Sequence, residues 1–345
     1  MERVDLRSDT VTLPSPAMRE AMSRAELGDD VFGEDPTVNR LQEMAAETLG
    51  KEAALLVASG TMGNLVAVLT HCGRGDGAIM GDLSHTFLNE GGGASAFGGI
   101  YMRAIRTQPD GRLDPDLIAA AIPSEDVHHP RVNLVCLENT HNYCGGTPLD
   151  ADYTATVADL AHQRGLAVHL DGARIFNAAL ALGVQVSDLA APVDSVMFCL
   201  SKGLSCPVGS LLCGSAEFIK RARRARKMVG GGMRQAGVLA AAGIVALEHM
   251  VDRLQEDHDN ARILAEGIAG IPGLGLDPDS VQTNIVFFDF LDRRMTPDQF
   301  CEKLKQQGVL MLALGPGRVR AVTHYGIERA DVERAVQVVH SVMAG

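Results

Sequence analysis

The stretch DSVMFCLSKGLSCPVGSLLCG, residues 194–214, decides the fold and suggests the chemistry. Its apolar run 195–200 has β-branched and aromatic members, which predicts a buried strand, and 210–213 predicts a second one. Lys202 follows the first strand directly, flanked by serine and glycine. A lysine amine withdrawn from water loses its proton more easily and can form a Schiff base with an aldehyde. Lys202 is therefore a candidate nucleophile, with a solvated turn lysine as the ordinary alternative.

The composition is that of a soluble globular α/β protein. The chain has 345 residues, of which 46% are hydrophobic and 21% charged, with 37 glycines. This length suits one large domain plus a smaller one, or two comparable domains. The net charge of −12 opposes general affinity for nucleic acid or anionic membranes. Tryptophan is absent and aromatic residues make up 4%, which argues against base-stacking platforms.

Cysteine usage and apolar segments bear on the compartment. The seven cysteines are scattered without a C-x-x-C pair, so we expect reduced thiols with neither disulfides nor a metal site. The opening MERVDLRSD lacks the apolar core of a secretory signal. The longest apolar stretch, 236–247, is too short to span a bilayer. These features predict a cytoplasmic protein with no membrane contact.

Strands and helices alternate through the middle of the chain. Apolar runs at 132–137 and 166–170 predict two further strands, and 151–164 predicts the helix between them. This order indicates a mostly parallel sheet, in which ligands gather at the carboxyl ends of the strands. Asp171 and Lys202 each follow a strand, and their separation of 202 − 171 = 31 positions is about one βαβ unit. We therefore expect both side chains at one edge of the sheet.

Two further signals point to a cofactor. The turn Ser59-Gly60-Thr61 opens a helix, so its N–H groups could bind a phosphate or serve as an ordinary cap. His85 lies just beyond a predicted strand, where it could stack on a flat ring or cap a helix. With a lysine and an aspartate at one edge, these parts fit a pyridoxal phosphate pocket, in which the carboxylate pairs with the pyridine nitrogen. Arginines would bind the substrate carboxylate through bidentate hydrogen bonds.

The sequence resembles the low-specificity L-threonine aldolases over nearly its whole length. These enzymes belong to the aspartate-aminotransferase-like, fold-type I pyridoxal phosphate enzymes. The motifs DGAR, SKG and GGGMRQAG together are very specific. The resemblance rests on RSDTVT (7–12), SGTMGN (59–64), ENTHNYCGGT (138–147), HLDGAR (169–174), LSKGL (200–204), PVGS (207–210), GGGMRQAG (230–237) and VTH (322–324).

The resemblance assigns roles to residues at the cofactor. It implies that Lys202 is the lysine that carries pyridoxal phosphate, that His85 stacks on the ring, and that Asp171 holds the pyridine nitrogen. It also implies that the turn at 59–61 binds the phosphate.

The resemblance likewise assigns a substrate site. It implies that Ser8, Arg174 and Arg320 hold the substrate carboxylate, with Arg174 also near the cofactor. His141 would lie near the substrate hydroxyl. Arg234 would reach the phosphate from a neighbouring subunit, in a homotetramer built from dimers with shared sites.

The implied reaction is retro-aldol cleavage of L-threonine, L-allo-threonine and related β-hydroxy-α-amino acids such as phenylserine to glycine and an aldehyde. His85, His141 or a bound water would take the hydroxyl proton. Three departures put side-chain preference and stereochemistry in doubt: Phe32 where the family often has tyrosine, Ser205-Cys206 where glycine-alanine is commoner, and an altered segment 86–99.

Two other functions stay open. A β-eliminating lyase such as tryptophanase would use the same cofactor but release pyruvate and ammonia. A regulator could use the basic run KRARRARK, 220–227, to bind nucleic acid, although a solvated helix face or a subunit interface suits the acidic whole better.

We predict a large cofactor-binding domain over 1–246, including the extended N-terminal segment, and a small α+β domain over 247–345. In the small domain the patterns predict helices at 247–264, 296–307 and 331–343, and strands at 284–290, 309–314 and 318–322.

Overall fold

The computed structural model describes residues 3–124 and 126–345. Its central sheet has seven strands in the order β2-β8-β7-β6-β5-β3-β4. Strands β7, β6, β5, β3 and β4 run parallel, while β8 is antiparallel to both its neighbours. The mostly parallel α/β sheet is therefore confirmed. The strands are β2 (Ala53–Val57), β3 (Gly77–Gly81), β4 (Tyr101–Ile105), β5 (Val132–Glu138), β6 (Ala167–Asp171), β7 (Ser195–Cys199) and β8 (Ser210–Gly214).

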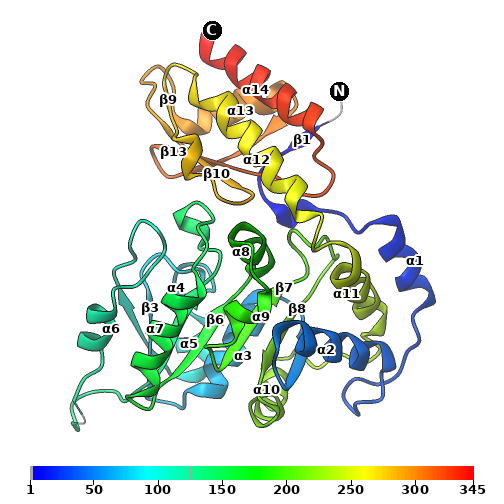
Figure 1. The fold of residues 1–345 in the computed structure, drawn as a ribbon, viewed down its shortest axis with the longest axis vertical. Helices are drawn as coiled ribbons and strands as arrows, with labels where there is room; N and C mark the ends of the chain where they lie inside the picture. The colour runs from blue at the N-terminus through cyan, green and yellow to red at the C-terminus, as the bar shows by residue number, and fades with distance from the viewer. Residues whose placement is uncertain (1–2, 125) are drawn as a thin grey trace.

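Helices cover both faces of this sheet (Figure 1). Alternate residues of β7 point to opposite faces: Val196 and Phe198 pack in one core, Met197 and Cys199 in another. The second core contains α3 and α10, and the first is shared by α2, α7, α8, α9 and α11. The helices of this domain are α1 (Pro16–Arg24), α2 (Pro36–Leu49), α3 (Gly60–His71), α4 (His85–Leu88), α5 (Gly93–Gly98), α6 (Pro115–Ala121), α7 (Ala151–His162), α8 (Ile175–Leu182), α9 (Val186–Ala190), α10 (Ala216–Met228) and α11 (Gly237–His249).

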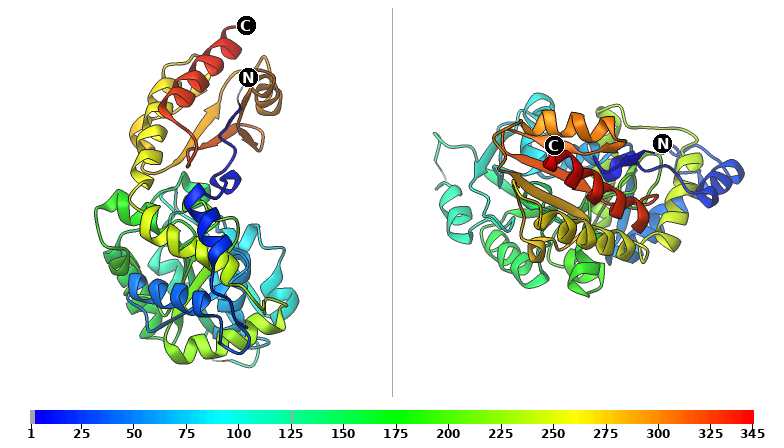
Figure 2. Two further views of the ribbon diagram at one scale, coloured as in Figure 1. Left: turned by 90° about the vertical axis from the view of Figure 1, so that its right-hand side faces the viewer. Right: turned by 90° about the horizontal axis from the view of Figure 1, so that it is seen from above.

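The C-terminal part forms a smaller α+β unit with its own core. An antiparallel sheet of order β12-β13-β10-β9 packs against three helices, and Figure 2 shows these helices along one side of it. Its elements are α12 (Leu254–Ala269), β9 (Leu274–Gly275), β10 (Ile285–Phe290), α13 (Pro297–Gln306), β11 (Val309–Leu310), β12 (Leu312–Leu314), β13 (Arg318–Val322) and α14 (Arg329–Ala344).

The N-terminal strand belongs to this smaller unit, which corrects our assignment of the segment to the large domain. Strand β1 (Val4–Asp5) pairs in parallel with β11, and Val4 and Leu6 are buried in the small core. The chain then passes through the short 3-10 helix η1 (Asp9–Val11) to α1 on the large domain (Figure 1). Residues 4–24 therefore connect the two domains.

Three local predictions were wrong. The helix expected at 247–264 is two helices, because α11 ends at His249 and α12 begins at Leu254. The strand expected at 309–314 is divided between two sheets. The basic run in α10 is not wholly solvated, because Arg226 is 2% exposed and binds Asp30 at 2.6 Å. Among the described residues, no helix combines the length and apolarity needed to cross a membrane.

Candidate active site

Asp171 lies at the tip of the central strand of the sheet. It is the last residue of β6 and pairs in register with Glu138 of β5 and Met197 of β7. Asp171 is buried, and its Oδ1 accepts the Ala173 N–H at 3.1 Å. The carboxylate therefore has a fixed orientation at the carboxyl end of the parallel strands.

Lys202 lies in the loop that follows β7, at the same edge of the sheet. Its carbonyl oxygen accepts the Ser205 N–H at 2.9 Å and the Thr12 hydroxyl at 3.2 Å. The side chain is half-buried. The charge of Lys202 lowers the pKa of His85 and that of Asp171 raises it, so the three side chains lie in one neighbourhood.

His85 begins helix α4 and forms a pair with a buried glutamate. Its Nδ1 lies 3.0 Å from Glu90 Oε1. This hydrogen bond raises the pKa of His85 against the opposing effect of burial. Burial in turn raises the pKa of Glu90, and the nearby Asp171 adds to that. The pair therefore holds a proton more firmly than either group would alone.

The ligand atoms of His85, Glu90 and Asp171 lie within 4.8 Å of one another, a spacing that could also hold a cation. The Asn64 Nδ2 group donates to both carboxylates, at 2.8 Å to Glu90 and 2.7 Å to Asp171. Because these N–H donors already compensate the carboxylates, we assign no metal ion to the cluster.

Helix α3 begins at the predicted phosphate site. The Ser59 hydroxyl caps it by accepting the Met62 N–H at 3.1 Å, so the cap interpretation holds for this side chain. The first N–H groups of a helix, here those of Gly60 and Thr61, have no intrahelical acceptor and can bind an anion. A Cβ at Gly60 would lie 2.8 Å from Cys199 Sγ, so glycine lets the helix approach the end of β7.

Arg174 is occupied by a partner that the sequence did not reveal. Its Nε and Nη2 bind the two oxygens of Asp9 at 2.6 and 2.7 Å, and both side chains are buried. Burial alone would raise the pKa of Asp9, but the Arg174 guanidinium lowers it to about 2. The Nε and Nη2 edge of the Arg174 guanidinium is therefore taken by Asp9, and the expected contact with a substrate carboxylate is left to Nη1 and the second hydrogen of Nη2.

Arg320 of β13 reaches toward the large domain. Its Nη1 donates to Asn142 Oδ1 at 3.0 Å and its Nη2 to the Arg7 carbonyl at 3.1 Å, while Nε is buried without a partner in the described chain. Burial lowers its pKa, and the charge of Arg174 adds to this effect. Two guanidinium groups face one buried Asp9, which suits the binding of an additional anion.

Glu138 accepts hydrogen bonds from residues on both sides of the site. Its Oε2 accepts the His85 N–H at 2.6 Å and its Oε1 accepts the Asn142 N–H at 2.8 Å. One carboxylate thus fixes both the start of α4 and the residue that contacts Arg320.

The other predicted residues lie in different settings. His141 is 2% exposed, and its Nδ1 has no partner in the described residues. Ser8 caps η1 and accepts the Thr10 N–H at 3.3 Å. Arg234 is half-exposed at the surface, where it binds Asp29 at 2.9 Å rather than a group of this site.

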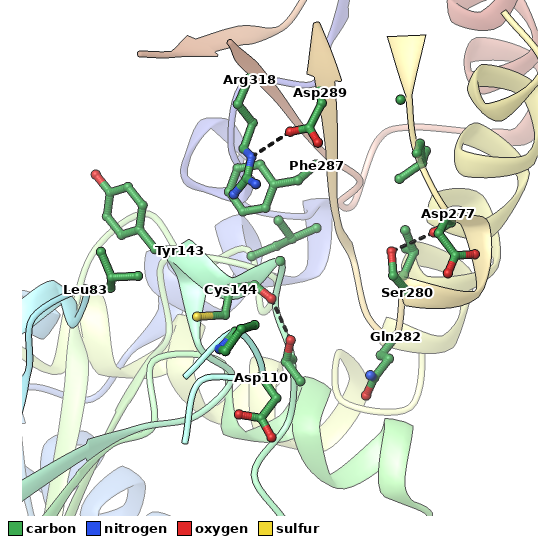
Figure 3. Close-up of a pocket in the computed structure, with 17 residues that line it drawn as sticks. Leu83, Asp110, Tyr143, Cys144, Asp277, Ser280, Gln282, Phe287, Asp289 and Arg318 are labelled. Carbon is green, nitrogen blue, oxygen red and sulfur yellow. Dashed lines mark hydrogen bonds and ion pairs between the residues drawn. The ribbon is translucent and has the colours of Figure 1, made fainter. Parts of the chain in front are cut away.

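A cavity of about 560 Å³ opens between the two domains beside the contact of Asn142 with Arg320. Figure 3 shows Leu83 and Tyr143 of the large domain facing Phe287, with Arg318 paired to Asp289 across the cavity's small-domain side. The cavity therefore adjoins the predicted substrate site.

Sequence reasoning missed several residues of the site. The sequence assigned no role to Asp9, Asn64, Glu90 or Glu138. Glu138 carries a usable signal, because it ends a strand as Asp171 does. The partners of Asn64 and Glu90 depend on packing between helices, which a single sequence does not show.

The geometry fits pyridoxal phosphate. A carboxylate at a strand tip, a lysine in the next loop, a histidine beside both and an open helix start converge at one place. Gly60 allows this helix start to pack against Cys199 at the end of β7, where a Cβ would lie 2.8 Å from the sulfur.

Comparisons with known proteins agree with this fit. The family model described as beta-eliminating lyase matches residues 5–291. Low-specificity L-threonine aldolase 1 of Arabidopsis thaliana is 46% identical, with 99% of this chain and 97% of the relative covered. The low specificity L-threonine aldolase of Escherichia coli K12 is 48% identical, with 95% and 96% covered.

Solved structures share the fold. A threonine aldolase structure from Leishmania major has a TM-score of 0.84 at 21% identity, covering 99% of each chain. Serine palmitoyltransferase of Sphingomonas wittichii has a TM-score of 0.78 at 18% identity, covering 99% of this chain and 87% of that one. With the sequence identities above, the chain belongs to the low-specificity L-threonine aldolases, within the beta-eliminating lyase family.

Proposed function

We propose that this protein cleaves L-threonine, L-allo-threonine and related β-hydroxy-α-amino acids such as phenylserine to glycine and an aldehyde, reversibly, with pyridoxal phosphate as cofactor. The observation that carries the proposal is the convergence of Asp171, Lys202 and His85 at one edge of the sheet in a chain of this family. When bound, pyridoxal phosphate supplies an electron sink for the bond broken between Cα and Cβ.

The residues of the large domain hold the cofactor. Lys202 is the residue to which it is attached, and Asp171 accepts from its ring nitrogen. His85 covers the ring, and the start of α3 from Ser59 binds the phosphate through backbone N–H groups. Arg234 reaches the phosphate of a neighbouring subunit, which its half-exposed position supports.

The N-terminal segment and the small domain hold the substrate carboxylate. Arg320 donates from its unpartnered Nε, Ser8 adds a hydroxyl, and Arg174 contributes Nη1, the one nitrogen that Asp9 does not occupy. These donors orient the amino acid so that its β-substituent faces the histidines.

The substrate hydroxyl proton moves to His85, His141 or a water held between them. For His85 the available atom is Nε2, because Nδ1 binds Glu90. The His141 Nδ1, buried and without a partner in the described residues, is the corresponding atom on the other side. The protein acts as a homotetramer built from two dimers with shared sites, and its cytoplasmic location stays a prediction.

Product analysis tests this proposal. The holoenzyme is incubated with L-threonine, L-allo-threonine and L-phenylserine, and glycine, aldehyde, 2-oxo acid and ammonia are measured. We expect equal amounts of glycine and aldehyde. The family name favours β-elimination as the second candidate. A 2-oxo acid with equimolar ammonia and no glycine would therefore replace the aldolase assignment with that one.

A further inference from the structure

A row of buried polar side chains runs through the large domain behind Asp171. It starts at His71 on α3, crosses to Ser195 at the beginning of β7, passes His169 in the middle of β6, and returns to Asn64 on α3. The last three are at most 1% exposed. The contacts are His71 Nε2 to Ser195 Oγ at 2.8 Å, Ser195 Oγ to His169 Nδ1 at 2.9 Å, His169 Nε2 to Asn64 Oδ1 at 3.1 Å, and Asn64 Nδ2 to Asp171 Oδ2 at 2.7 Å.

The orientation of the Asn64 amide follows from its partners. Two carboxylate oxygens, one from Asp171 and one from Glu90, lie within 2.8 Å of the same amide nitrogen. The NH₂ group has two hydrogens, and each carboxylate takes one. A flipped amide would point its oxygen at two acceptors and lose both hydrogen bonds. The Oδ1 atom must therefore accept from His169 Nε2.

The donor and acceptor atoms of the other side chains in the row follow from their partners in the same way. His169 donates from Nε2, and burial lowers its pKa to about 4, so the ring is neutral and Nδ1 is an acceptor. The Ser195 hydroxyl therefore donates to His169 and accepts from His71 Nε2. Burial lowers the pKa of His71 to about 3, so this ring is neutral as well. All donors in the row point toward Asp171.

We propose that Asn64 is a positioning residue that acts through Asp171 on the cofactor's ring nitrogen, and that His169 and Ser195 hold its amide in the required orientation. This inference rests on the proposed function, because it takes Asp171 as the partner of that nitrogen. Without the amide, Asp171 and Glu90 would face each other without the donor that compensates both. Asp171 would then no longer be held in the orientation from which it would pair with the ring nitrogen.

The test measures binding of two cofactor forms to the apoenzyme by equilibrium dialysis. One is pyridoxal phosphate and the other is its analogue with the ring nitrogen replaced by CH, which keeps the aldehyde and the phosphate. The dissociation constant of the analogue divided by that of pyridoxal phosphate measures how much the ring nitrogen strengthens binding. We expect Asn64→Ala to reduce this ratio by about 10-fold, the size of one hydrogen bond to a charged group. The analogue itself should bind nearly as well as it does to the unmodified enzyme.

Three further variants make the outcome decisive. Asn133→Ala removes an equivalent bond, from Asn133 Nδ2 to Asp76 Oδ2 at 2.7 Å, and should leave the ratio unchanged. His169→Phe keeps the ring volume but removes the donor to Asn64, so it should also reduce the ratio, which covers the case in which Asn64→Ala does not fold. Asp171→Ala should bring the ratio close to 1, because no carboxylate is left to pair with the ring nitrogen.

The variants distinguish an error in the role of Asp171 from an error in the role of Asn64. If Asp171→Ala leaves the ratio intact, the assignment of Asp171 in the proposed function is wrong. The other case is that Asp171→Ala brings the ratio close to 1 while Asn64→Ala and His169→Phe leave the ratio unchanged, either with normal binding of both cofactor forms or with both weakened equally. Asn64 then does not position Asp171, and the inference is overturned.

Discussion

The candidate site has two walls, one of large-domain residues around Asp171 and one of small-domain residues around Arg320, and they differ in how their polar groups are satisfied. On the large-domain wall, Asp171 accepts a hydrogen bond on each oxygen, and Asn64 uses its amide nitrogen and oxygen. On the other wall, the Nε of Arg320 and the Oδ1 of Asn284 are buried without partners among the described residues. A buried unsatisfied group costs about 1–3 kcal/mol, which a ligand that binds it would recover. Asp171 and Asn64 on the first wall are thus satisfied before ligands bind, although His141 Nδ1 and Ser205 Oγ on that wall lack partners in the described residues. The buried groups of Arg320 and Asn284 on the second wall are completed by ligands.

Lys202 lies in the loop after β7, and its removal should have the largest effect. Lys202→Ala should eliminate the visible absorption of the bound cofactor and lower kcat by roughly 10³-fold or more, because the group that carries the cofactor is lost. Absorbance spectra and threonine cleavage assays measure both. Lys51→Ala is the control, since Lys51 is also part-buried but binds the Val193 carbonyl at the opposite end of the strands. Full activity of Lys202→Ala would refute its role.

The large-domain wall should make stability depend on pH through His169. Burial lowers the pKa of His169 to about 4 in the folded protein, whereas the unfolded chain has a value near 6.5. The unfolded state therefore binds more protons between these values, and stability falls as pH decreases from 6.5 to 4, by about 3 kcal/mol from this residue. Urea unfolding at pH 7, 5.5 and 4 should show a shallower loss in His169→Phe than in the unmodified protein.

The matched control for this pH dependence is His162→Gln, because His162 is exposed and pairs with Asp194 at the surface. Its pH profile should follow that of the unmodified protein. Equal slopes for His169→Phe and the unmodified protein would mean that His169 is not held neutral, and the first wall would then not be preorganised in this way.

On the small-domain wall, we expect a substitution to change the kinetics with substrate rather than the dependence of stability on pH. Arg320→Gln should lower kcat/KM for threonine by roughly 30-fold, about 2 kcal/mol, because a charge-assisted hydrogen bond to the carboxylate is lost. Arg329→Gln is a control in the same domain: Arg329 is exposed at the start of α14 and pairs with Glu333, away from the site. Steady-state kinetics that show equal losses in both variants would indicate a general effect on the small domain.

The large-domain wall was largely predictable from sequence, and the other wall was not. Asp171 and Lys202 follow apolar strands one βαβ unit apart, so strand geometry alone places them at one edge. Arg174 and Asp9 are 165 residues apart in sequence, and the residues around neither of them predict that they form an ion pair. The N-terminal strand was misplaced for the same reason, since its parallel partner β11 lies some 300 residues later.

Buried charge was the second source of error. The basic run of α10 shows helical spacing, but its sequence does not show that Arg226 turns inward to Asp30 of a distant loop. Periodicity reports which face of a helix is apolar, whereas a buried ion pair depends on the partner that tertiary packing supplies.

Ser205 is an exception on the large-domain wall, and it should have the smallest effect. It has a φ of 62°, the left-handed conformation that favours glycine, and its buried Oγ has no partner in the described residues. Ser205→Gly should relieve the strain and remove the unsatisfied hydroxyl, raising the free energy of unfolding by about 1 kcal/mol after the entropy cost of glycine. Ser205→Ala removes only the hydroxyl, so urea unfolding of both variants separates the two contributions. If both variants instead weaken cofactor binding, the hydroxyl is a ligand-binding group and the loop after Lys202 belongs with the wall that the ligands complete.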